Sequence, residues 1–196
     1  MKKAEVILGF FIFLGIVLFI SNYPFGAVIL LLAGLMLSGF YIGYGVFLFN
    51  DISLRALLTK GTSLFRDIKV QDIMLSIISS ISISILIMGV LFKVLRWPFA
   101  HENLLVGFIM VVIALGFVLR NRLVNKRTVY RRLFLRLIVF GGIGLALLTQ
   151  SNSIFIELKY KDYPNYIEAV KELNEDPDDI LLQEKEQLEY DKMKGR

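Results

Sequence analysis

The stretch Gly89-Val-Leu-Phe-Lys-Val-Leu-Arg-Trp-Pro-Phe-Ala100 joins two long apolar runs in the middle of the chain. A fainter copy, Gly15-Ile-Val-Leu-Phe-Ile-Ser-Asn-Tyr-Pro-Phe-Gly26, joins two apolar runs near the N-terminus. The copies are offset by 74 residues (89 − 15), so that Tyr23 corresponds to Trp97, Pro24 to Pro98 and Phe25 to Phe99. Because each copy links one run to the next, the sequence predicts two related helical hairpins in series.

The composition predicts an all-α integral membrane protein. Of the 196 residues 56% are hydrophobic, the mean hydropathy is +0.67, and the apolar runs approach the roughly 17–25 residues that span a bilayer. Within lipid such runs must be helical, since an unpaired backbone amide costs several kcal/mol there. We expect a membrane domain over residues 1–150, with hairpins 5–49 and 73–120. Its five helices are expected at about 5–21, 26–49, 73–95, 102–120 and 133–150.

The first apolar run follows Lys2 and Lys3, as it would in a signal peptide. No small-x-small cleavage site follows it, and the next apolar run begins almost at once. A first membrane helix is therefore the favoured interpretation.

Charge is divided along the chain. Residues 1–150 hold 15 Lys/Arg against 5 Asp/Glu, a net +10, whereas residues 151–196 hold 7 against 12, a net −5. The basic residues gather before the first helix and in links 50–72 and 120–132, which favours a cytoplasmic N-terminus in a bacterial inner membrane. Five spans then place the acidic tail in the periplasm. Nucleic acid is not an expected partner, because the basic residues flank apolar spans.

The segments outside the spans have weaker patterns. Link 50–72 has leucines at helical spacing and predicts a short interfacial helix broken near Gly61. In the tail, residues 154–160 alternate enough for a short strand or an extended arm. Pro164 fits the first turn of a helix that stops before Pro177, and Asp176 or Asp178 is expected to cap a second one.

The proline turns have a clear physical role. Proline lacks an amide hydrogen and disfavours a helical residue before it, so each first helix should end there. Trp and Tyr prefer the headgroup region, and Lys93 is expected to point its ammonium toward that interface rather than into the bundle. The predicted interface or docking residues are Tyr23, Pro24, Phe25, Lys93, Arg96, Trp97, Pro98 and Phe99.

A second candidate feature is a stripe of serines, Ser76, Ser80 and Ser84, spaced four residues apart on one helix. Small polar residues let membrane helices approach closely and bond across the contact. They could also line a polar path, so close packing and a small transporter or channel subunit both remain open. We favour packing.

No catalytic constellation is evident, so we expect no enzyme, no cofactor and no metal site. The chain has no cysteine and a single histidine, His101, which excludes thiolate ligands and a histidine cluster. Its neighbour Glu102 is the only acid beside it, and adjacent residues on a helix do not face each other.

Residues 92–100, Phe-Lys-Val-Leu-Arg-Trp-Pro-Phe-Ala, resemble the Phe-Lys-x-x-His-Trp-Pro-Gly-Ala turn of the GldL family, the membrane motor proteins of bacteroidete gliding motility and type IX secretion. There the turn joins two membrane helices on the periplasmic side. Here Arg96 replaces the usual His and Phe99 the usual Gly. The family's intramembrane acid has no counterpart in residues 104–119. The resemblance therefore implies a shared hairpin and not a proton motor.

Together these features predict a non-enzymatic inner-membrane scaffold or accessory protein. It would contact membrane lipids and dock other membrane proteins, or copies of itself, through its turns and its acidic tail. The transporter or channel subunit is the alternative.

Overall fold

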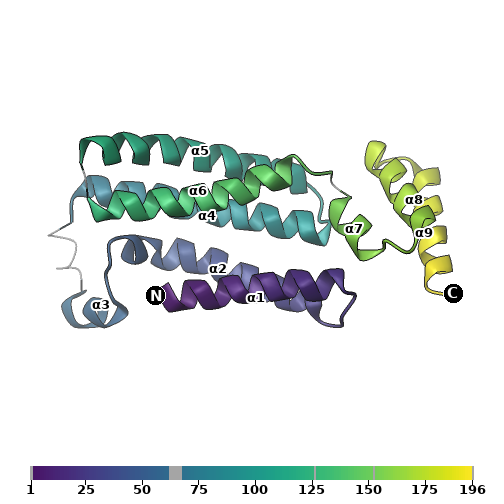
Figure 1. Ribbon diagram of the computed structural model, residues 1–196, viewed down its shortest axis with the longest axis horizontal. Coiled ribbons are helices and arrows are strands. Elements are labelled where there is room, and N and C mark those ends of the chain that lie inside the picture. The colour runs from purple at the N-terminus through teal and green to yellow at the C-terminus, as the bar shows by residue number, and fades with distance from the viewer. Residues whose placement is uncertain (1, 62–67, 126, 152, 196) are drawn as a thin grey trace.

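The computed structural model describes residues 2–61, 68–125, 127–151 and 153–195. Within these ranges the regular elements are all helices, which confirms the all-α fold (Figure 1). In chain order they are α1 (Lys2–Ile20), α2 (Gly26–Phe49), α3 (Leu54–Lys60), α4 (Val70–Leu95), α5 (Ala100–Val124), α6 (Thr128–Leu148), α7 (Ile154–Lys159), α8 (Pro164–Glu175) and α9 (Ile180–Met193).

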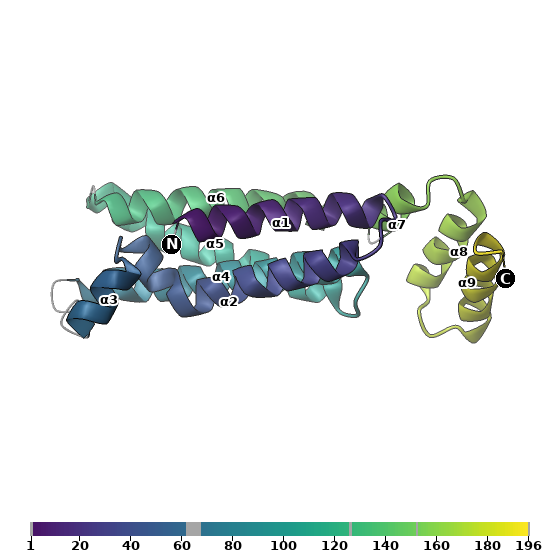
Figure 2. The ribbon, with the colours of Figure 1, turned by 90° about the horizontal axis from the view of Figure 1, so that it is seen from below.

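Four helices of the described chain, α1, α2, α4 and α5, are long and apolar enough to cross a membrane. We expected a fifth at 133–150. The corresponding α6 lies beside α4 and α5 (Figures 1 and 2), but it does not meet the same criterion. Its arginines, Arg131, Arg132 and Arg136, make it less hydrophobic than the other four.

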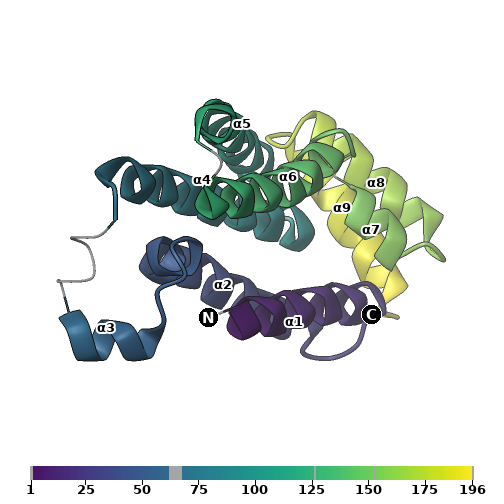
Figure 3. The same cartoon turned by 60° about the vertical axis from the view of Figure 1, so that its left-hand side comes forward.

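The long helices form two layers. The α1–α2 hairpin packs against the α4–α5 hairpin through α2 and α4, and α6 joins the second layer (Figure 3). One end of the bundle holds the N-terminus, α3 and the α5–α6 link, and we call it the basic end. The other end holds the turns at 21–25 and 96–99 and the tail helices, and we call it the turn end (Figure 1).

The two hairpins cross in the same register. A Cβ added to Gly15 would lie 2.7 Å from the Leu30 Cα, and one added to Gly89 would lie 2.6 Å from the Leu104 Cα. Both leucines are fully buried, and each member of the second pair follows its counterpart by 74 residues. Glycine is therefore required at the same point of both hairpins, where the two backbones approach most closely.

The segments outside the bundle correct two expectations. Residues 154–159 form α7 and not a strand, because a lone strand would leave its amides without partners whereas a helix bonds its own. Helix α8 begins at Pro164 as expected, but the cap of the next helix is Asp179, whose carboxylate accepts from the Leu181 amide at 2.8 Å. Asp176 instead ends α8, since its own amide donates to Glu172.

The link between the hairpins is partly described. Helix α3 lies off the side of the bundle (Figure 3) and ends just before Gly61, which is left-handed (φ 52°). The break near Gly61 is thus where we expected it. The second half of the expected interfacial helix includes residues 62–67, which lie outside the described residues.

Candidate functional site

Both hairpin turns use one backbone plan to end their first helix. Asn22 and Arg96 are left-handed, with φ of 56° and 57°. The next amide in each case donates to a carbonyl five residues back, Tyr23 to Leu18 and Trp97 to Phe92, both at 2.9 Å. This is the Schellman arrangement, which satisfies carbonyls that a helix end would otherwise leave unbonded.

A second left-handed residue opens the returning helix in each turn. Phe25 has φ of 69° and Phe99 has φ of 59°, and their side chains are 73% and 72% exposed. A bulky residue rarely adopts this conformation, because its Cβ crowds the backbone. The chain thus presents two exposed rings at positions where glycine would be relaxed.

The other aromatic residues of the turns are less alike. Tyr23 is 62% exposed, whereas Trp97 is 38% exposed and packs edge-on against Phe92, with ring centres 5.0 Å apart. Pro24 and Pro98 separate the two left-handed residues of each turn. The predicted turn residues therefore do gather at one end of the molecule.

Lys93 differs from our expectation. Its side chain is only 1% exposed, and its ammonium donates to the backbone carbonyls of Leu147 and Gln150, the latter at 2.7 Å. The Leu147 carbonyl belongs to the last turn of α6 and the Gln150 carbonyl lies just beyond it, where a helix end carries partial negative charge. Lys93 reaches across the bundle because this helix end offers it two acceptors, which open interface does not provide in fixed positions.

In the first hairpin, the residues equivalent to Lys93 and Arg96 contact α7. Phe19, the counterpart of Lys93, lies under the Lys159 ammonium, which is 4.0 Å from the ring centre. Asn22, the counterpart of Arg96, donates its side-chain amide to the Lys159 carbonyl at 3.0 Å. Burial lowers the pKa of Lys159 below its ordinary value, and nearby Lys194 lowers it further.

Arg96 contacts the tail itself. Its guanidinium lies 3.8 Å from the Glu186 carboxylate, which also accepts from the Tyr166 hydroxyl at 3.0 Å. Burial raises the pKa of the Tyr166 phenol above its ordinary value, and Glu186 raises it further. A hollow of about 300 Å³ lies between the second turn and tail residues Asn174 and Pro177, and exposed His101 and Glu102 line it. The tail therefore covers part of the predicted docking turn.

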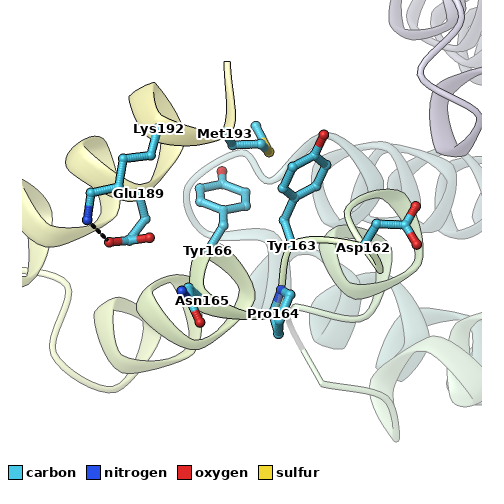
Figure 4. Close-up of a pocket in the computed structure, with 8 residues that line it drawn as sticks. All are labelled: Asp162, Tyr163, Pro164, Asn165, Tyr166, Glu189, Lys192 and Met193. Carbon is cyan, nitrogen blue, oxygen red and sulfur yellow. Dashed lines mark hydrogen bonds and ion pairs between the residues drawn. The ribbon is translucent and has the colours of Figure 1, made fainter. Parts of the chain in front are cut away.

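A second hollow, of about 310 Å³, lies within the tail between α8 and α9 (Figure 4). Tyr163 and Tyr166 stand side by side over it, and the Lys192–Glu189 pair, 2.6 Å apart, closes one side. The same two helices bury Tyr166 and Val170 with the partly buried Met193. This apolar contact gives the tail a small core of its own.

The serine stripe lies in the contact between α2 and α4. Ser84 bonds the Ser38 hydroxyl at 2.6 Å, and a Cβ added to Gly45 would lie only 1.8 Å from the Ser80 hydroxyl oxygen. Ser76 and Ser80 each donate to the carbonyl one turn earlier, both at 2.7 Å. These buried hydroxyls form hydrogen bonds and occupy the small spaces between the two helices, as close packing requires.

Sequence reasoning missed a polar site within the bundle. Glu5 of α1 accepts a two-pronged bond from Arg136 of α6, at 2.7 and 2.6 Å, and a further bond from the Tyr41 hydroxyl of α2. A forked guanidinium–carboxylate contact fixes geometry as well as charge. The sequence held a signal for this site, because an acid stands at the start of one apolar run and an arginine stands inside another.

Asp72 forms the matching site in the second hairpin. It is fully buried, forms an ion pair with Arg127, and accepts from the Tyr130 hydroxyl at 2.6 Å. A third pair, Arg132 with Asp51, lies at the same end. Residues 127–136 therefore connect to acids of α1, α4 and the α2–α3 link.

Comparison with protein-family models yields no match, and no curated protein or solved structure is significantly similar to the chain. The function must therefore be argued from the residues and their geometry.

Proposed function

We propose that this chain is a non-enzymatic membrane scaffold that docks another membrane protein at its turn end. The observation that carries the proposal is the pair of exposed, left-handed phenylalanines, Phe25 and Phe99. A strained backbone conformation costs of order 1–3 kcal/mol and persists only where the surroundings impose it. The repetition of this cost in both hairpins, each time for an exposed ring, fits selection for contact rather than for stability.

Aromatic side chains commonly dominate protein interfaces, because they bury a large area with little loss of conformational freedom. Phe25, Phe99, Tyr23 and Trp97 all belong to the turn end. Among the described buried side chains, by contrast, every polar atom except the Ser79 hydroxyl has a hydrogen-bond partner. This gives less support to the alternative, a small transporter or channel subunit, since a path along the serines would need the space that Ser80 and Gly45 fill.

The proposed setting is the inner membrane of a bacterium, with a cytoplasmic N-terminus, a periplasmic tail and α6 as the fifth span. An arginine inside a membrane is costly unless it is paired, and the Glu5–Arg136 contact would lower that cost for α6. The GldL-like turn supports shared ancestry with that hairpin, and a role beside gliding or type IX secretion machinery is part of the proposal.

Glycine substitution separates docking from folding. Phe25→Gly and Phe99→Gly, singly and together, should relieve backbone strain and leave the protein level unchanged or higher. Recovery of a membrane partner, measured by crosslinking in native membranes followed by mass spectrometry, should fall at least severalfold in the double variant.

The matched control is Phe13→Ala, which removes a ring that is 66% exposed on α1 away from the turns. It should leave partner recovery unchanged. Unaltered recovery in the double glycine variant would refute docking through the turns, as would recovery of no membrane protein from the unmodified chain.

A further inference from the structure

A basic hollow lies at the opposite end of the molecule from the proposed docking turns. It has a volume of about 550 Å³ and is lined by Leu119, Arg122, Leu123, Arg127 and Arg131, from the end of α5 to the first turns of α6. Three arginines thus line one concave surface where the chain leaves one long helix and enters the next.

The arginines of this region fall into two groups, those with a carboxylate partner and those without one. Arg127, Arg132 and Arg136 each form an ion pair with a carboxylate. Arg122 instead stacks on the Phe134 ring at 4.4 Å, and Arg131 is exposed. Neither Arg122 nor Arg131 pairs with any carboxylate in the part of the chain that the structure describes. The hollow therefore carries positive charge that the described residues do not neutralise.

The hydrophobic lining indicates what kind of anion would complete the site. Leu119 is 41% exposed and Leu123 is 75% exposed, and beside them Val124 is 75% exposed. The exposed face continues along α5 through Phe117 and Ile113, which are 49% and 52% exposed. A ligand that fits both features has an anionic head and long hydrocarbon chains.

We propose that this hollow binds the phosphate headgroup of an anionic phospholipid, whose acyl chains lie along α5. Guanidinium groups bind phosphate through paired, charge-assisted bonds, and basic pockets between membrane helices bind anionic headgroups in this way. A zwitterionic lipid binds less well because it brings its own cation. Inorganic phosphate binds less well because it lacks the chains. The proposal stands apart from docking at the turn end.

The test is a lipid titration of the full chain, delipidated in detergent and followed by native mass spectrometry. Phosphatidylglycerol and phosphatidylcholine with the same acyl chains are compared. We expect tighter binding of phosphatidylglycerol, weakened about fivefold by Arg122→Gln and again by Arg131→Gln, since each surface arginine contributes about that factor. Arg131→Gln removes no contact described here, so its folding should be intact, and Arg131→Lys should recover part of the affinity.

Arg120→Gln is the matched control, because it removes the same charge from an exposed arginine of α5 that does not line the hollow. It should leave the affinity unchanged. Equal losses in Arg120→Gln, or no loss in Arg122→Gln and Arg131→Gln, would overturn the proposal in favour of nonspecific attraction. Displacement of phosphatidylglycerol by inorganic phosphate at equal concentration would instead assign a plain anion site.

Discussion

The two hairpins share a backbone plan but hold different parts of the molecule. Their turns agree in the left-handed residues and in the glycine crossings. At the equivalent positions 19 and 93, however, the first hairpin has a ring that meets a lysine of α7, and the second has a lysine that caps α6. The residues that set the hairpin are alike in both copies, whereas the residues beside them differ and hold different C-terminal segments.

The hairpins also differ in burial. Helix α4 is the most buried of the four candidate spans and α1 the least, because α4 packs against α2, α5 and α6 whereas α1 packs mainly on α2. Each hairpin nevertheless ties an acid of its first helix to an arginine at position 127 or 136 and to a tyrosine. Equivalent changes should therefore cost more in the second hairpin than in the first.

The largest effect is expected at the acids. Removing one partner of a buried ion pair leaves an uncompensated charge and costs about 3–5 kcal/mol, so Asp72→Ala should approach that loss. Glu5→Ala should cost less, since the Glu5 side chain is 17% exposed and Asp72 is fully buried. Stability can be measured by titrating sodium dodecyl sulfate into mild detergent and following helicity.

Glu102→Ala is the control for these variants, because it removes an exposed acid of the second hairpin and should have little effect. An equal loss in Glu5→Ala and Asp72→Ala would show that α1 is held as firmly as α4. That outcome would contradict the ranking of the two hairpins.

The glycine crossings come next. Gly89→Ala would push a methyl group to 2.6 Å from backbone atoms of α5, and overpacking of this kind costs about 1–3 kcal/mol. Gly15→Ala meets a similar clash, and its cost in stability should lie in the lower part of that range. The controls are Gly116→Ala and Gly9→Ala, where an added Cβ meets nothing within 4 Å. Their unfolding midpoint in the same detergent titration should be unchanged or higher. A neutral Gly89→Ala would mean that the hairpin can open without loss.

Substitutions at Lys93 and Phe19 test the difference between the two equivalent positions. Lys93→Met keeps the length of the side chain but leaves the carbonyls at the end of α6 without their donor, at a cost of about 1–2 kcal/mol. Phe19→Leu keeps an apolar side chain against the neighbouring core but removes the contact between a cation and a ring, worth about 0.5–1 kcal/mol. Thermal unfolding of both variants in one detergent would rank them. A larger loss in Phe19→Leu would mean that α7 matters more to the bundle than the end of α6 does.

The sequence predicted what depends on local chemistry. The lengths of the apolar runs predicted the long helices, the prolines predicted the turns, and the 74-residue offset predicted the paired hairpins. A charged residue within an apolar run signals a polar site, but the partners that Lys93, Glu5 and Asp72 find in and beside α6 could not be predicted. Each of them lies more than 50 residues away along the chain and depends on how α6 packs. The short strand or extended arm expected at residues 154–160 was wrong, because these residues form α7 and alternation alone ignores whether a neighbouring strand exists.

The smallest effect concerns the attachment of α7, which the first hairpin holds through Lys159. At the start of this helix Glu157 accepts from the buried Ser153 hydroxyl at 2.8 Å and pairs with Lys171 of α8 at 3.1 Å. These contacts hold the pKa of Glu157 below its ordinary value.

A depressed carboxyl pKa stabilises the folded state above the unfolded pKa of about 4.3, and this contribution is lost as the pH falls through the folded value. A fluorophore on a cysteine at Leu158, which is 49% exposed, should therefore report loosening of α7 only when the pH falls below that unfolded value. Glu157→Gln should remove that step and leave the contact of Phe19 with Lys159 intact. If the step persists in Glu157→Gln, then a group other than Glu157 controls the attachment of α7.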